Sequence, residues 1–367
     1  MSKAHPVDVL IVSLGSTEGL RTADEELEDS LRRAGVSVAL ARPLPPTAIR
    51  TLMLTDLVWA RAARAAAAHM LAQLQRSPPR AIVYSSTTAA LLWPRPGAIR
   101  FDAPAACNRP GRHGLWQHPL ERRRLRAAPL LLPWSEGGLR EVPASARRGD
   151  RALVLPVPVE PSGPPAPERD IAAITYAANP AKKGLDRVLS AWLEVRGELG
   201  AGTPAGSGSA GAPAELVVTG ASPDELRLAG FALEREEGVR VVGALSAESY
   251  RALLRRARVF LCAPRREDYG IAQLEALADG CLLVTTPSPG PYVALQIARE
   301  LDARLVSDDL EGALRLALKD PLPHYAQRAL QVLAPFSREA TDSLVAQDLL
   351  PRLLTDSLDE TETMPLE

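Results

Sequence analysis

Two glutamates, Glu267 and Glu275, stand eight positions apart around the start of a predicted helix. The helix covers residues 270–279, and the apolar runs 258–264 and 281–286 on either side predict buried strands. In a doubly wound sheet, the loop at a strand's carboxyl end and the following helix N-terminus form the crevice that binds ligands, phosphates especially. Glu267 lies in that loop. The segment is therefore the first candidate for a ligand site.

The position of Glu275 on the predicted helix is unusual for a charged residue. At about 100° per residue it lies about 40° past Ile271, on the flank of the apolar sector that also holds Leu274 and Ala278. A carboxylate at the edge of a core is unfavourable unless a hydrogen bond compensates it. Glu275 is therefore a candidate ligand-binding residue. The alternative is a structural glutamate that bonds to nearby backbone or reaches solvent.

A second candidate site follows the apolar run 171–176, which predicts another strand. Asn179 and the adjacent Lys182 and Lys183 precede Gly184 and an amphipathic helix. A glycine there lets the backbone approach a ligand closely, and a lysine at the start of the helix can reach an anionic group as a mobile point charge. The alternative is a solvated lysine pair at the start of a surface helix.

The Glu267 segment resembles the signature of retaining glycosyltransferases of the GT-B fold. Seven residues separate the two glutamates, an aromatic–glycine pair lies between them, and Glu-Ala-Leu-Ala-x-Gly closes the segment. The resemblance extends back through residues 215–220 and 239–248 and forward to 288–291, where the family usually carries a glycine pair. It covers residues 171–310 well and the first 150 residues loosely. It implies two Rossmann-like, doubly wound α/β domains that face each other across a cleft.

The resemblance also implies roles for the residues that match. Lys183 would grip the diphosphate of a nucleotide-sugar donor, together with the helix N-terminus at Gly270 and Ile271. Glu267 would lie near the sugar, where it holds hydroxyls or stabilises developing positive charge. Glu275 would accept the ribose hydroxyls. The family needs no bound metal, and the absence of an Asp-x-Asp motif agrees with that.

The family usually has an arginine a few residues before the lysine, and residues 177–179 contain none. Lys182, Asn179 or one of Arg265 and Arg266 compensates, or the grip on the diphosphate is weaker than usual. The sequence does not decide among these alternatives.

The first half offers weaker candidates. The family places a His or an Asp near the reacting sugar, and Asp102, after the short apolar run 99–101, is the candidate for this role. His113 and His118 are rivals, each of which is otherwise an ordinary loop or helix-end residue. Gly15, after the first strand, would let the backbone approach the diphosphate, although any sharp turn favours a glycine.

The elements that must hold these residues alternate between strands and helices, which predicts parallel sheets with crossover helices. A Gly-x-Gly-x-x-Gly sequence after the first strand is absent, which argues against a dinucleotide-binding oxidoreductase. One helix is expected from about Thr22, as an N-cap with Glu25 as its capping-box partner, to Ala34, with Gly35 ending it. In the first half we expect strands at 7–12, 36–41 and 81–85 and a long helix at 56–76.

A proline-rich run at 155–170 marks the domain boundary. We expect an N-terminal domain at 1–158, on the acceptor side, and a nucleotide-sugar-binding domain at 159–338. A closing helix at 339–354 is expected to cross back onto the first domain, as in the resembled family. Residues 200–214 are predicted to be a mobile insertion without function, and the acidic tail 355–367 to be disordered.

Composition excludes several classes of protein. The chain has 367 residues and a formal net charge of −1, which argues against nucleic acid as a partner. Cys262 and Cys281 adjoin apolar strands and are expected in the core, and no zinc-ligand spacing occurs. The chain lacks a leader and a membrane-spanning run, so we expect a cytoplasmic protein. The basic run 120–126 is either a solvated helix face or a peripheral membrane contact.

The sequence therefore predicts a retaining, metal-independent glycosyltransferase, and among these it favours a hexosyltransferase. The enzyme is expected to use a nucleotide-diphosphate sugar as co-substrate and to need no cofactor. The acceptor is a saccharide, a lipid or a small molecule. The alternatives are a phosphorylase or epimerase on the same fold, or an inactive relative that binds sugar nucleotides. The sequence names neither the sugar, the nucleotide, the acceptor nor the oligomeric state.

Overall fold

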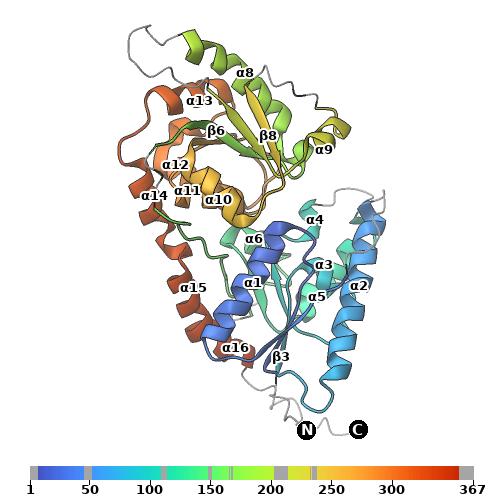
Figure 1. Cartoon of the computed structure of the whole chain (residues 1–367). Coiled ribbons are helices and arrows are strands. Elements are labelled where there is room, and N and C mark those ends of the chain that lie inside the picture. The colour runs from blue at the N-terminus through green and yellow to red at the C-terminus, as the bar shows by residue number, and fades with distance from the viewer. Residues whose placement is uncertain are drawn as a thin grey trace, which may run out of the picture. The chain divides into compact units, whose positions relative to one another are not determined.

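The chain divides into two compact units in the computed structural model (Figure 1). The first comprises Met1–Pro158 and Arg338–Glu367, and the second comprises Val159–Ser337. The structure describes residues 7–44, 52–108, 114–147, 151–164, 166, 168–201, 214–231, 233 and 238–354. Most of the predicted insertion, at 202–213, and the predicted disordered tail 355–367 lie outside these residues.

The first unit is built on a parallel five-stranded sheet in the order β2-β1-β3-β4-β5. Its strands are β1 (Val9–Val12), β2 (Val38–Ala41), β3 (Ala81–Tyr84), β4 (Ala98–Phe101) and β5 (Leu131–Pro133). Its helical segments are α1 (Glu18–Arg33), α2 (Leu52–Gln73), α3 (Thr87–Ala90), α4 (Ala105–Asn108), α5 (Gln117–Ala127), α6 (Glu136–Glu141), α15 (Arg338–Leu344), the π-helical η5 (Val345–Leu349) and α16 (Leu350–Leu354).

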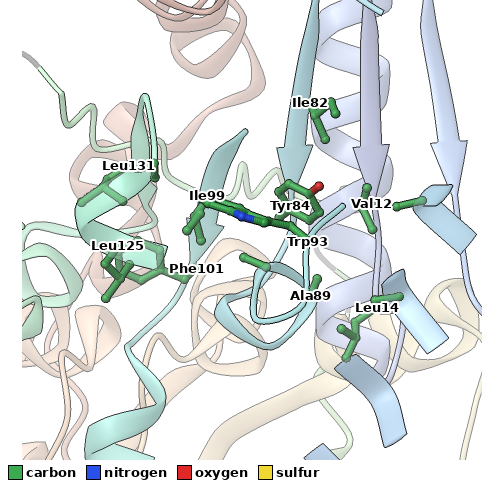
Figure 2. Packing of buried hydrophobic residues seen from close by; sticks show 14 of the residues in the cluster. Val12, Leu14, Ile82, Tyr84, Ala89, Trp93, Ile99, Phe101, Leu125 and Leu131 are labelled. Atoms are coloured by element: carbon green, nitrogen blue, oxygen red, sulfur yellow. The ribbon is translucent and has the colours of Figure 1, made fainter. Parts of the chain in front are cut away.

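Alternate residues of these strands enter two different cores, because successive side chains of a strand point to opposite faces. On one face Val12, Tyr84 and Ile99 pack with Trp93 and with Leu125 of α5 (Figure 2). The rings of Tyr84 and Trp93 are 5.6 Å apart at their centroids. Both faces are apolar and covered by helices, so the strands read as continuous apolar runs rather than alternating ones.

On the other face, Val9 and Ile11 of β1 pack against α1 and against the closing helical segments of the chain. Val345 and Leu349 of η5 are fully buried in this core. Arg33 of α1 also forms an ion pair with Asp342 at 2.6 Å. The last described helices therefore belong to the first unit, although they follow the second unit in sequence.

The start of α1 differs from the prediction. The helix begins at Glu18, and Thr17 is the N-cap: its side chain accepts a hydrogen bond from the Leu20 backbone N–H. The predicted cap, Thr22, lies inside the helix. The prediction was wrong because Thr22 and Glu25 have the spacing of a capping box. The actual cap is Thr17, and the acidic Glu18 that follows it also suits the first turn of a helix.

The second unit has its own parallel five-stranded sheet, in the order β10-β9-β6-β7-β8. Its strands are β6 (Ile171–Tyr176), β7 (Leu216–Thr219), β8 (Val239–Gly243), β9 (Ala257–Cys262) and β10 (Leu282–Thr285). Its helical segments are α7 (Pro180–Lys183), α8 (Leu185–Ala201), α9 (Pro223–Leu228), α10 (Ala247–Arg256), α11 (Ile271–Ala278), α12 (Val293–Asp302), η3 (Ala303–Leu305), α13 (Leu310–Lys319), α14 (Tyr325–Leu333) and η4 (Ala334–Phe336).

The apolar face predicted for the helix after Gly184 is the buried face of α8. Leu185, Val188 and Trp192 are at most 1 % exposed. The indole N–H of Trp192 donates to the carbonyl of Gly238 at 3.2 Å. Cys262 and Cys281 are buried as expected. The second unit is thus a doubly wound α/β domain whose sheet carries β6 and β9 side by side, so that the loops after them are neighbours.

Candidate active site

The candidate site lies at the carboxyl edge of the second sheet. Because β6, β9 and β10 are parallel, the loops that follow them leave the sheet at the same edge. The loop after β9 carries Glu267 and leads into α11, and α7 follows β6. The sheet therefore brings together two segments that the sequence separates by more than 80 residues.

Two glycines allow the β9 loop to adopt its path. Gly270 has φ +93°, and a Cβ there would lie 2.9 Å from the Tyr292 ring. Gly290, in the loop after β10, has φ +112°, and a Cβ there would lie 2.1 Å from the backbone oxygen of Glu267. L-residues rarely adopt such φ values, and these distances leave no room for a side chain. The Glu267 backbone is held close to the Gly290 turn.

Lys183 and Glu267 are in direct contact. The Lys183 Nζ donates to Glu267 Oε2 at 2.6 Å. The two side chains are 22 % and 9 % exposed, so the pair is partly shielded from water. Gln273 of α11 donates to the same carboxylate oxygen at 3.3 Å. The sequence assigned Lys183 and Glu267 to the same ligand, and the structure shows them bonded to one another.

The helix bearing Lys183 differs from the predicted one. Lys183 ends the short helix α7, and Gly184, with φ +65°, separates it from α8. Asn179 is the N-cap of α7, where its side chain accepts from the Lys182 N–H at 3.1 Å. A Cβ on Gly184 would lie 1.9 Å from the backbone oxygen of Ala263. The end of α7 therefore packs directly against the loop after β9.

Asp268, next to Glu267, balances two further cations. Its carboxylate is 2.8 Å from Arg266 Nε and 3.4 Å from Lys182 Nζ. The Asp268 side chain is only 4 % exposed. The β9 loop thus carries two adjacent carboxylates, each paired with a cation, and one lysine of α7 is directed at each of them.

Glu275 lies farther along α11, more than a turn past its start. Its side chain is 21 % exposed, and its Oε1 lies 3.8 Å from Arg251 Nη1. Burial, with the nearby charge of Glu275, raises the pKa of Tyr250 well above its ordinary value. Tyr250 is therefore neutral at physiological pH, and the carboxylate lies beside a buried phenol and a guanidinium.

The N-terminus of α11 adds backbone donors to this edge. The helix begins at Ile271, and its N-cap, Gly270, has no side chain to satisfy the first N–H groups. Free N–H groups at a helix start attract anions. Glu267 lies four residues before Ile271. The edge therefore combines a lysine, a carboxylate and a helix N-terminus.

Residues 160–329 match the sequence profile of the family described as glycosyl transferases group 1. This match spans nearly all of the second unit. The second unit is a group 1 glycosyltransferase domain. No curated protein matches the chain in sequence.

Solved structures with the GT-B fold resemble the whole chain. Sucrose-phosphate synthase from Thermosynechococcus elongatus has 14 % identity and a TM-score of 0.64, covering 96 % of this chain and 100 % of its own. An E. coli trehalose-6-phosphate protein bound with UDP-2-fluoro glucose has 13 % identity, a TM-score of 0.62 and coverages of 93 % and 98 %. Anabaena HepE in complex with UDP has 12 % identity, a TM-score of 0.58 and coverages of 94 % and 99 %. The predicted GT-B fold is confirmed, and the family match with this fold supports a glycosyltransferase.

The three cations suggested as substitutes for the missing arginine are all engaged. Arg265 forms an exposed ion pair with Asp186 at 2.8 Å and donates to the Ala181 carbonyl. Arg266 and Lys182 pair with Asp268. Of the three, Lys182 has the longest ion-pair distance, 3.4 Å.

The candidates in the first unit are not brought together by any described contact. Gly15 follows β1 with φ +57°, and its carbonyl accepts from Arg21 at 2.9 Å. Asp102 follows β4, and its Oδ1 accepts the N–H of Ala103 at 2.7 Å. His118 lies in the first turn of α5. His113 lies outside the described residues.

The basic run is helical, as predicted, and lies on α5. Arg124 is partly buried: its guanidinium lies 4.8 Å from the Trp93 ring centroid and donates to the Leu91 carbonyl. Arg122, Arg123 and Arg126 remain exposed. Among the described residues, no helix is long and apolar enough to cross a membrane, and no cluster of His, Cys, Asp or Glu side chains is arranged to hold a metal ion.

Sequence reasoning missed Gln273, Asp268 and Arg251. Gln273 gave one signal: a long polar side chain within a helix whose neighbours Ala272, Leu274 and Ala276 are apolar. The hydrogen bond from the Gln273 amide to Glu267 depends on the path of the loop before α11, which the sequence does not give.

Proposed function

We propose that the protein transfers a sugar from a nucleotide-diphosphate donor to an acceptor, with retention of anomeric configuration and without a bound metal ion or cofactor. The observation that carries this proposal is the contact of Lys183 with Glu267 beside the N-terminus of α11. Lys183 can bind a departing diphosphate, and Glu267 can interact with the sugar.

Transfer requires stabilisation of a leaving diphosphate and of an oxocarbenium-like centre. Lys183 and the first N–H groups of α11, at Gly270 and Ile271, supply positive charge and dipoles for the diphosphate. Glu267 supplies negative charge near the sugar. Glu267 and the N-terminus of α11 are in place before the reaction, and preorganised groups of this kind lower a barrier by electrostatic stabilisation.

Glu275 suits the ribose of the donor. It is partly exposed and lies along α11 from the proposed diphosphate site. Its carboxylate can accept bonds from two hydroxyls. The similar proteins whose structures contain UDP-2-fluoro glucose or UDP support a nucleotide-sugar donor.

The test begins with a thermal-shift screen of nucleotide sugars, followed by product detection with the donors that stabilise the protein. Glu267→Ala should then lower kcat by about 100-fold or more, the scale of losing one preorganised electrostatic group. Donor affinity, measured by calorimetry, should stay within a few-fold, because Glu267 acts mainly in the transition state.

Glu248→Ala is the matched control, since Glu248 is an exposed glutamate in the first turn of α10. Its kcat should equal that of the wild type. Normal turnover by Glu267→Ala contradicts the assigned centre of the site. Donor binding without turnover by the wild-type protein indicates a nucleotide-sugar-binding module instead.

A further inference from the structure

The carboxylate of Glu267 receives two donors on one oxygen. Oε2 accepts from Lys183 Nζ at 2.6 Å and from Gln273 Nε2 at 3.3 Å. Under the proposed function, on which this inference rests, Lys183 turns toward the donor diphosphate. Gln273 then becomes the side chain that still holds Glu267.

The burial of Gln273 is unfavourable for the fold by itself. The residue is 2 % exposed, and its Oε1 has no hydrogen-bond partner among the described residues. A buried carbonyl oxygen without a partner loses its hydration and gains nothing in return. An unbranched apolar side chain of similar length would fill the same space without that loss. Packing therefore does not explain a glutamine here.

The direction of the amide is set by a second contact. Gln273 Nε2 also lies 3.8 Å from Cys262 Sγ, which itself donates to Thr285 Oγ1. Burial raises the pKa of the Cys262 thiol, so the sulfur is a neutral, weak acceptor. Both neighbours of Nε2 are therefore acceptors. Reversing the amide would place Oε1 against the Glu267 carboxylate, which is repulsive, so the N–H groups face Glu267.

We propose that Gln273 is a positioning residue: its amide keeps the Glu267 carboxylate oriented once the donor has drawn Lys183 away. Gln273 sits on α11, a helix whose buried face packs in the core, whereas Lys183 is a flexible side chain on α7. A donor on a packed helix holds its acceptor in place more firmly than a donor on a mobile chain, and small misplacements of a reacting group reduce rates strongly.

The experiment uses Gln273→Met, which keeps length and removes both N–H groups, with Gln273→Leu as a second variant if the first folds poorly. We expect kcat to fall about tenfold or more, because the lost hydrogen bond has a charged acceptor. The Kd of the donor should stay within about twofold, since the amide bonds Glu267 rather than the diphosphate. The melting temperature should equal or exceed that of the wild type. The control is Gln331→Met, an exposed position on α14, which should change none of these quantities.

A double-mutant cycle with Glu267→Ala separates positioning from a general structural effect. If Gln273 acts through Glu267, Gln273→Met causes no further loss of kcat in the Glu267→Ala background. An unchanged kcat in Gln273→Met, or a full loss that persists without Glu267, overturns this inference and leaves the proposed function intact. A wild-type protein that turns over no nucleotide sugar contradicts the proposed function, and the inference with it.

Discussion

Asp24, a buried carboxylate in the first unit, should make the stability of the folded protein depend on pH. It lies on α1 with 0 % exposure, and Ser13 Oγ donates to its Oδ2 at 2.5 Å. Burial raises the pKa of Asp24 to about 6, and the Ser13 hydrogen bond and the charge of the buried Arg100 oppose this rise. The folded protein therefore holds the Asp24 proton more tightly than the unfolded chain does.

The sign and size of the effect follow from linkage. The ordinary pKa is 3.8 and the folded value is about 6, which at about 1.4 kcal/mol per pH unit corresponds to about 3 kcal/mol. Between these two values the folded state binds more protons than the unfolded state, so stability falls as pH rises. The contribution of protonated Asp24 is fully present below pH 3.8 and is lost above about pH 6.

Asp24→Asn should remove this dependence, because an amide carries no charge and still offers an oxygen to Ser13. The variant should be more stable than the wild type at pH 7.5, by about 3 kcal/mol at most, and the difference should shrink to near zero toward pH 4. Urea denaturation of both proteins across this range measures it. Asp29→Asn, at an exposed position of the same helix, is the control.

A pH-independent difference would refute the reasoning. So would a variant that is less stable at pH 7.5, since that result means that Arg100 and Ser13 stabilise a charged Asp24 by more than burial disfavours it.

Two further predictions concern the diphosphate. Lys183→Ala should weaken binding of a nucleoside diphosphate about tenfold or more and leave nucleoside affinity unchanged, because a charged donor is lost; Lys182→Ala, compared by calorimetry, should have the smaller effect. Turnover should survive a chelator, because Lys183 and the start of α11 supply the positive charge. If a chelator stops turnover and magnesium restores it, this account of the diphosphate is wrong.

Much of the fold was predictable because its signals are local. The apolar runs at β6, β9 and β10 and the apolar face of α8 were recognised from periodicity alone. Boundaries were less accurate where two local signals compete, as at the start of α1. There Thr17 and Thr22 both offer a cap, and the contacts of the turn decide between them.

The contacts among the candidate site residues were not predictable from the sequence. The sequence placed Glu267 in the loop before α11 and Glu275 on that helix, but it put Lys183 at the start of the longer helix rather than at the end of α7. It could not show that Lys183 bonds Glu267 or that Arg251 approaches Glu275. Such pairs depend on which strands are neighbours, and the order with β9 beside β6 follows from the sheet as a whole. Gln273 was missed for a different reason: its partner lies six residues before it, and their contact depends on the path of the loop that leads into α11.

The pairing of Lys183 with Glu267 changes how their individual contributions must be read. The Lys183 ammonium already has a carboxylate partner at 2.6 Å, so under the proposed function donor binding exchanges one ion pair for another. The affinity lost in Lys183→Ala is then the difference between the two pairs and not the full strength of the lysine–diphosphate contact. Under the proposed function, the same exchange leaves Glu267 without its cation when the sugar is bound. A carboxylate released at that moment, and still held by Gln273, has its negative charge free to stabilise the cationic centre of the transition state.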